Sequence, residues 1–144
     1  MAVQRDNPYA NFNFLVDIGI GEEIQFSEVE IPAAEVDVIE YREGADRISS
    51  SRRLPGRARY GNVVLRRGIS GRLELWEWFK AIRDGQILRR DVTVTLLDEQ
   101  RQQVHRWLLR DAWPTKYDAS DLNAKGNEAV IETLELAVEG IEIE

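Results

Sequence analysis

The sequence predicts a mainly β domain, a sandwich or barrel-like fold with one flanking α-helix. Apolar and polar residues alternate over most of the chain, a pattern typical of half-buried strands. One stretch changes to apolar spacings of three and four, which indicate an amphipathic helix. The chain has 144 residues, of which 43% are hydrophobic, enough to bury a core. We therefore expect a single domain over residues 1–144.

Three strands are expected in the first part of the chain. Residues 11–20 (NFNFLVDIGI) carry apolar side chains at every second position. Residues 22–31 continue this alternation until Ser27, where its phase shifts by one residue. Such a shift predicts a bulge or a strand that turns a corner. Residues 35–44 form a third expected strand, with weaker alternation.

Residues 43–60 are expected to project as a long loop or a loosely paired hairpin tip. They have no sustained period and contain three consecutive serines, Pro55 and Gly56. Long loops without secondary structure are uncommon inside compact domains and are usually functional. The surrounding region is also strongly basic: residues 42–67 hold eight arginines and two acids, a net charge of +6. Because the whole chain has a net charge of −7, the remainder carries −13.

A short strand and the helix follow this region. Residues 60–68 read as a strand that closes at a glycine. In residues 70–85 the apolar spacing predicts a helix, with Ser70 as its N-cap and Leu73 as the start of its apolar face. Gly85 is expected to stop the helix.

The last part of the chain is expected to return to β structure. Residues 91–113 read as a hairpin, and Pro114 is expected to end its return strand. Residues 127–144 read as the last strand, which we expect to be acidic on one face. Four glutamates produce that expectation: Glu135, Glu139, Glu142 and Glu144.

The residue inventory gives no support to catalysis or to a bound cofactor. The chain has no cysteine and a single histidine, His105, on a strand of alternating character. No nucleotide-binding glycine motif and no calcium-binding loop occurs. We expect no enzyme activity, no metal and no cofactor. No apolar run is long enough for a signal peptide or a membrane span, so neither is expected.

The basic stretch on an acidic body suits two kinds of partner. Its arginines supply charge for binding phosphates, and Tyr60 offers a ring on which a base could stack. The acidic body would, however, repel a polyanion from most directions. The same arginines suit the carboxylates of a second copy, because a planar guanidinium bonds them in a bidentate fashion. A head-to-tail contact of this kind propagates as rings or filaments.

Six motifs in sequence order resemble the tail tube protein family of contractile-tailed phages and contractile injection systems. They are NFNFLVDIG at the start, then YREG, LPGRARY, LRRG before WEW, AWPTK and ETLELAVEG. The resemblance covers roughly residues 7–143. It implies a sandwich or barrel-like tail tube fold whose copies form rings of six, and the rings stack into a hollow inner tube. A contractile sheath surrounds that tube in the family and drives it through a target envelope.

The resemblance also implies partners and candidate residues. Baseplate and cap proteins close the tube, protein or DNA cargo occupies its lumen, and the particle is assembled in the cytoplasm as a phage tail or an injection particle. In the family, the loop after the early strands reaches the adjoining ring. The corresponding residues here are Arg47, Arg52, Arg53, Arg57, Arg59 and Tyr60. Polar-face residues that are candidates for the lumen are Asp17, Thr93, Thr95, Glu135 and Glu139. The alternative is a soluble β domain that binds nucleic acid or cargo through its arginine-rich loop.

Overall fold

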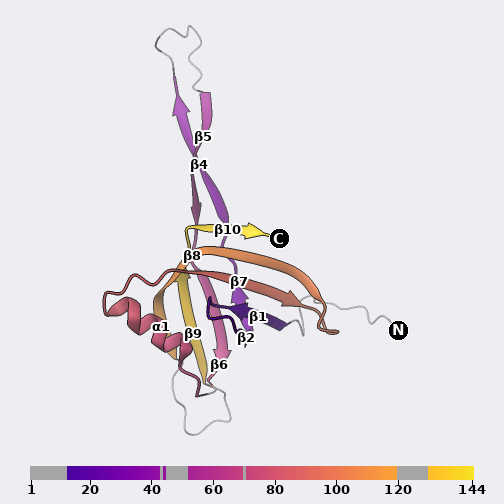
Figure 1. Ribbon diagram of the computed structural model, residues 1–144. Coiled ribbons are helices and arrows are strands. Elements are labelled where there is room, and N and C mark those ends of the chain that lie inside the picture. The colour runs from indigo at the N-terminus through magenta and orange to yellow at the C-terminus, as the bar shows by residue number, and fades with distance from the viewer. Residues whose placement is uncertain (1–12, 43, 45–51, 70, 120–129) are drawn as a thin grey trace.

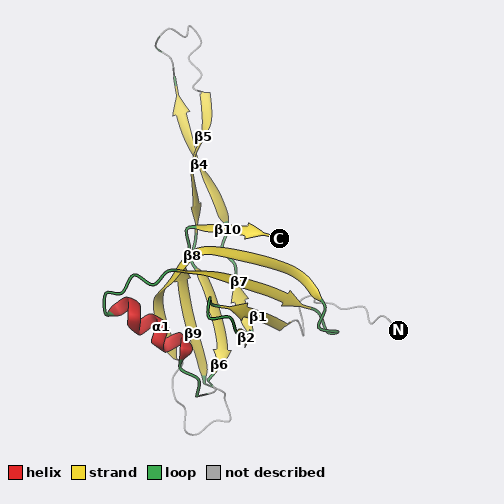
Figure 2. Ribbon diagram, in the orientation of Figure 1, coloured by secondary structure: helices red, strands yellow, loops and turns green. Residues whose placement is uncertain are grey.

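The computed structural model describes residues 13–42, 44, 52–69, 71–119 and 130–144. These residues form a β-sandwich with one flanking helix and a projecting two-stranded arm (Figures 1 and 2). The elements in chain order are β1 Asn13–Asp17, β2 Glu23–Phe26, β3 Glu28–Glu30, β4 Ala34–Tyr41, β5 Arg52–Tyr60, β6 Val63–Gly68, α1 Glu74–Arg83, β7 Arg90–Leu97, β8 Gln103–Ala119, β9 Ile131–Ala137 and β10 Gly140–Ile143.

Seven strands form one path in the order β2-β1-β7-β8-β9-β6-β3, and β10 also pairs with β8. The alternation in the sequence explains why these strands bury one face. Val92 and Val94 on β7 and Leu134 and Leu136 on β9 are fully buried, whereas the residues between them are half-exposed. The inward side chains of both halves of the sheet meet in a single core. The mainly β prediction is confirmed.

The phase shift at Ser27 is a corner where the chain changes neighbours. Strand β2 pairs with β1, and β3 pairs with β6 on the other side of the sandwich. At the corner, the backbone nitrogen of Ser27 donates a hydrogen bond to the carbonyl oxygen of Arg66 at 3.0 Å. The corner predicted from the sequence is therefore confirmed, and it links the two ends of the strand path.

Strand β8 has 17 residues and joins both halves of the sandwich. Its first part lies between β7 and β10, and its second part pairs with β9. The expectation that Pro114 ends the strand is wrong, because β8 continues to Ala119. The ladder is irregular between Pro114 and Lys116, and an irregular position of this kind is where a sheet tolerates proline.

Helix α1 closes one side of the core. Leu75 and Trp78 are buried among the core residues, and the indole nitrogen of Trp78 donates to the carbonyl oxygen of Leu88 at 2.9 Å. Gly85 follows the helix with a φ of +93°, which confirms the predicted stop. The predicted start is wrong. The N-cap position is Leu73, which is exposed and makes no side-chain cap, and Ser70 lies outside the described residues.

The expected loop over residues 43–60 is partly wrong, because Arg52–Tyr60 forms strand β5. This strand pairs with β4, and together they make the arm that Figure 1 shows extending away from the sandwich. The hairpin alternative is the one that the structure supports, while residues 43 and 45–51 lie outside the described residues. The expected last strand is likewise divided, into β9 and β10, at Val138 and Glu139.

In the part of the chain that the structure describes, no helix has the length and apolar character needed to span a membrane.

Candidate assembly interface

The arm exposes apolar side chains on both of its faces. Ile39 and Leu54 lie directly opposite each other and therefore share one face of the arm. Val36 and Val38 are two residues apart on β4, so both lie on the other face. All four are about half-exposed or more. A two-stranded hairpin alone is at best marginally stable in water. The arm therefore presents an apolar surface that the described part of this chain leaves uncovered.

Gly56 allows the two strands of the arm to approach closely. A Cβ atom at this position would lie 2.9 Å from Cγ1 of Ile39 and 3.1 Å from the carbonyl oxygen of Asp37. The ladder is irregular nearby, between Val36 and Val38. Any larger residue at position 56 would have to displace Ile39, which is one of the exposed apolar side chains.

The arginines of the arm fall into two groups. Nε of Arg59 lies 2.7 Å from a carboxylate oxygen of Asp37, and its Nη2 lies 3.5 Å from Glu35, so its charge is matched within the arm. Arg52, Arg53 and Arg57 are exposed, and no ion pair between described residues involves them. These three cations on β5 therefore have no ion-pair partner among the described residues and suit contact with another molecule.

Tyr60 and Arg47 are the remaining predicted contact residues. Tyr60 is half-buried at the root of the arm, beside a hollow of about 310 Å³ that Glu35, Arg59 and Gly61 also line. Arg47 lies outside the described residues. Tyr60 is therefore separated from Arg52 and Arg53 by most of the length of β5, whereas Arg57 lies between them.

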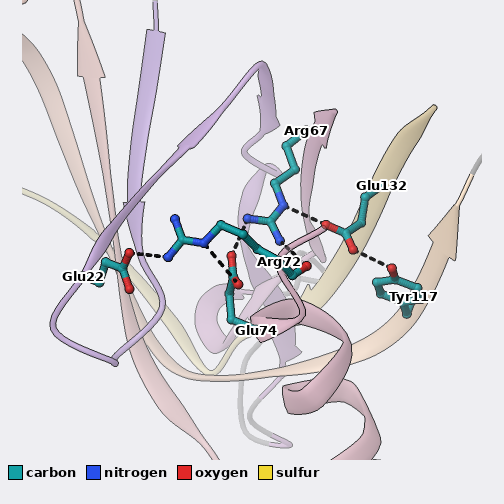
Figure 3. A network of polar contacts seen from close by, with 6 residues as sticks. All are labelled: Glu22, Arg67, Arg72, Glu74, Tyr117 and Glu132. Atoms are coloured by element: carbon teal, nitrogen blue, oxygen red, sulfur yellow. Dashed lines mark hydrogen bonds and ion pairs between the residues drawn. The ribbon is translucent and has the colours of Figure 1, made fainter. Parts of the chain in front are cut away.

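A chain of alternating charges crosses the body of the molecule (Figure 3). Arg67 is almost completely buried; its Nε donates to Glu132 at 2.7 Å and its Nη1 to Glu74 at 2.5 Å. Arg72 contacts Glu74 and also pairs with Glu22, which lies in the turn between β1 and β2. The chain of contacts ties the start of α1 to β6 and β9.

Tyr117 completes this network at its buried end. Its hydroxyl donates to the second carboxylate oxygen of Glu132 at 2.5 Å. Burial, followed by the hydrogen bond to Glu132 and the charge of that carboxylate, raises the pKa of Tyr117 to about 12. Burial acts to raise the pKa of Glu74, but the hydrogen bond from Arg67 and the nearby cations hold it below its usual value.

No catalytic or metal-binding residue was predicted from the sequence, and His105, the single histidine, lies in an aromatic contact. The ring of His105 packs edge-on against Trp107, with 4.5 Å between the centroids. Among the described residues, no group of three or more His, Cys, Asp or Glu side chains could hold a metal ion. The arm and the surfaces of the sandwich are therefore the candidate functional sites of the described chain.

Residues 10–142 match the family of the T4-like virus tail tube protein gp19. The chain belongs to this family. Searches among curated protein sequences found no match. A chain in the cryo-EM structure of the sheath–tube complex of the extracellular contractile injection system PVC, in its extended state, is 26% identical, with a TM-score of 0.79 over 96% of this chain and 93% of that one.

Other solved structures share the tail tube fold. A chain in the cryo-EM structure of the anti-feeding prophage cap is 26% identical, with a TM-score of 0.79 over 100% of this chain and 94% of that one. Hcp1 from Flavobacterium johnsoniae is 16% identical, with a TM-score of 0.54 over 92% of this chain and 93% of that one, which shows a common fold alone. The resemblance to tail tube proteins is confirmed, and the chain is a structural inner tube subunit.

The candidate lumen residues of this tail tube protein fall on different parts of the sheet. Asp17 pairs with Thr93 across β1 and β7, and Thr95 follows on the same outward face. Glu135 lies on the other half of the sandwich, where its carboxylate accepts a hydrogen bond from Asn62 at 2.9 Å. Glu139 lies after β9. The structure therefore brings Asp17, Thr93 and Thr95 together and leaves the other two apart.

The acidic face expected at the end of the tail tube chain is matched by arginines. Glu142 accepts two hydrogen bonds from Arg110, and the guanidinium of Arg106 lies 3.3 Å from Glu144. Arg89 pairs with Glu139. Each of these three carboxylates has a cation beside it, so the last strands present paired charges in place of a continuous acidic surface.

Sequence reasoning missed the buried network, although the strand pattern contained a signal for it. Arg67 is in phase with Val63 and Leu65 on β6, and Glu132 is in phase with Leu134 on β9. A charged residue at an inward position of each of two strands indicates a buried ion pair once those strands are neighbours. Their pairing, Arg67 opposite Glu132, supplies that condition.

Proposed function

We propose that this chain is the repeating subunit of the inner tube of a contractile injection particle. Six copies form a ring, rings stack into a hollow tube, and a contractile sheath surrounds the tube and drives it through a target envelope. The arm is the observation that carries this proposal. A projecting hairpin with uncovered apolar side chains on both faces and three exposed arginines suits docking on another copy.

The arm supplies the contacts between rings in this proposal. Arg52, Arg53 and Arg57 pair with carboxylates of the adjoining copy, because their charges are not matched within the described part of their own chain. Arg59 instead stiffens the arm through Glu35 and Asp37. Arg47 and Tyr60 belong to the same proposed contact region.

The lumen is proposed to carry protein or DNA cargo past the polar outer face of β1 and β7. Asp17, Thr93 and Thr95 form that face, and Glu135 and Glu139 remain further candidates. Hydroxyl and carboxylate groups at such positions would stay hydrated and would not hold a polyanion. Cap and baseplate proteins close the two ends of the tube.

The proposed role is structural and not catalytic. Subunits are made and assembled in the cytoplasm, and the finished tube leaves or remains with the cell as part of a phage tail or an injection particle. The match to a chain in the sheath–tube complex of an extracellular contractile injection system supports the place of the finished tube in such a particle. No step in the proposal needs a metal ion or a cofactor.

Negative-stain electron microscopy of the purified protein, together with its molar mass in solution, tests the proposal. Rings of six or stacked hollow tubes are expected. A uniform monomer that also fails to assemble when a baseplate-bearing extract is added would contradict it.

Charge reversal at the arm sharpens this test. The triple variant Arg52→Glu, Arg53→Glu and Arg57→Glu should abolish tubes and leave the circular dichroism spectrum unchanged, because these side chains are exposed. A matched control with the same charge change is Lys80→Glu, Arg101→Glu and Lys116→Glu, all exposed and away from the arm. Tubes from the arm variant would show that its arginines are not inter-ring contacts.

A further inference from the structure

The core of the sandwich is closed by α1 on one side and open at a second place, where a groove is found. Two adjoining hollows of about 600 Å³ and 280 Å³ share Leu96 and Trp107 among their lining residues. We call them together the groove, and its apolar lining is Phe14, Val29, Ile31, Leu96, Val104 and Trp107.

The groove is a continuation of the core that the helix does not cover. Phe14 lies opposite Leu96 across β1 and β7, and Leu96 lies opposite His105 across β7 and β8, so all three side chains face the interior of the sandwich. Phe14 and Trp107 pack against the core but remain half-exposed. Val104, at the rim, is 51% exposed. Apolar surface of this kind, adjoining a core, is typical of an interaction site.

The rim of the groove is acidic. Glu28 lines it, and Glu30 follows two positions later on β3 with its side chain on the same face. Both carboxylates share one guanidinium, since Nη1 of Arg66 lies 3.3 Å from Glu28 and 2.9 Å from Glu30. Two acids against one cation leave a net charge of −1 at this position, and both acids are more than half exposed.

The arm has the complementary chemistry. It offers exposed apolar side chains, such as Ile39 and Leu54, next to the arginines at positions 52 and 53. The arm cannot be assigned to the groove of its own chain, because Figure 1 shows it extending away from the sandwich. Its first residue, Ala34, comes shortly after Ile31 in the groove lining, so the groove opens close to the root of the arm.

We propose that the groove receives the arm of a second copy, with Ile39 and Leu54 or Val36 and Val38 against its apolar lining and with Arg52 and Arg53 at its acidic rim. This inference rests on the proposed function and adds the receiving surface to it. Arm and groove are different surfaces of one molecule, so the contact is head-to-tail. Every bound copy offers its own free arm to the next, which lets the assembly propagate.

Reciprocal photo-crosslinking tests the groove directly. The photo-reactive residue p-benzoylphenylalanine replaces Ile39 in one variant and Val38 in a second, which places it on either face of the arm. A third variant carries it at Val104, on the rim of the groove. A control carries it at Glu77, an exposed position of α1. Tubes are isolated, irradiated and digested, and the linked peptides are identified by mass spectrometry.

We expect at least one arm variant to link to residues 28–31 or 104–107 of another copy, and the Val104 variant to link to residues 34–41 or 52–60. The Glu77 control should give neither product. Intact tubes whose arms link elsewhere would overturn the groove and leave the tube function standing. Links from Val104 to residues 1–12 of the same chain would overturn it as well, because the groove would then be filled from within. Failure of the parent protein to form tubes would contradict the proposed function itself.

Discussion

The buried pair of Arg67 and Glu132 holds β6, β9 and α1 together through groups that are expensive to remove from water. Both side chains are almost fully buried, and each hydrogen-bonding group of the guanidinium that faces the network has a partner. Replacing both charges by apolar residues can be neutral, whereas removing one leaves an uncompensated buried charge. The pair is thus sensitive to single substitutions in particular.

Arg67→Met should lower the free energy of unfolding by about 3–5 kcal/mol, because Glu132 would remain buried without its cation. Urea denaturation monitored by tryptophan fluorescence measures this change. The control Arg110→Met breaks an exposed pair with Glu142 and should cost far less, because water screens that pair. Equal losses in the two variants would show that the Arg67 network is not a buried stabilising unit.

Tyr117 makes stability dependent on alkaline pH. Its pKa rises from 10.0 to about 12 in the folded protein. A raised pKa means that the folded state favours the neutral phenol. The contribution of Tyr117 to the free energy of unfolding is therefore complete below pH 10 and is lost as the pH rises toward 12. Tyr117→Phe should therefore flatten the fall of unfolding free energy over this range.

Ultraviolet titration of the phenolate checks the same prediction without denaturation. The difference between the parent protein and Tyr117→Phe isolates one tyrosine of the four in the chain. A transition well above pH 10 is expected for the folded protein, and a transition at the ordinary value after unfolding in urea. An ordinary pKa in the folded state would contradict the contact with Glu132.

Among the elements, the arm depends most on a single small residue. Gly56→Ala would place a methyl group against Ile39 and the backbone of Asp37. The arm must shift, while the sandwich is unaffected because the arm extends away from it (Figure 1). We expect tube formation to be lost and the free energy of unfolding to change by less than about 0.5 kcal/mol.

Gly44→Ala is the matched control for this change. Nothing lies within 4 Å of a Cβ atom built at Gly44, so tubes should form as in the parent protein. In both variants, electron microscopy shows whether tubes form, and urea denaturation measures the free energy of unfolding. Normal tubes from Gly56→Ala would show that the shape of the arm near Ile39 does not matter for docking.

The elements that the sequence predicted well are those with a buried face. Val92 and Val94 alternate with threonines because one side of β7 contacts the core, and Gly85 ends α1 because the chain needs a positive φ there. Strand β5 was predicted only through the hairpin alternative to a loop, because an isolated arm buries neither face and so leaves no alternation to detect. The prediction that Pro114 ends its strand failed for a related reason. The irregular ladder that accommodates this proline depends on β9, which is distant in sequence.

The candidate site was only partly predictable. The arginine-rich stretch marked the arm by its charge, but the sequence did not show that Arg59 is paired with Asp37 while Arg53 is not. That distinction depends on the register between β4 and β5. The groove was not predicted, because Val29 and Trp107 belong to separate strands and read as ordinary core residues until the sheet closes around them.

At the scale of the whole molecule, the arm and the groove are the two surfaces of the proposed contact. A subunit that keeps only one of them should therefore interfere with assembly. A subunit in which an Asn-Gly turn replaces residues 35–59 keeps the groove and lacks the arm; Ala34 and Tyr60 are already paired at that point. We expect it to fold with nearly the stability of the parent protein and to form no tubes on its own, because the arm supplies the contacts between rings in the proposed assembly.

Mixed with the parent protein in substoichiometric amounts, the armless subunit should shorten the tubes. It can bind an arm but offers none to the next ring, so each incorporated copy removes one of the contacts through which the tube grows. Tube lengths measured by electron microscopy check this prediction. The triple variant at Lys80, Arg101 and Lys116, added in the same amount, should leave the lengths unchanged.

Strand β8 gives the subunit a mechanical property as well as a shape. It is a member of both halves of the sandwich, bonded to β7 and β10 along one part and to β9 along the other. Pushing one half past the other along this strand therefore loads many backbone hydrogen bonds together, in shear, and does not peel them apart one at a time. The two halves of the sandwich should therefore resist sliding past each other when a force acts along β8.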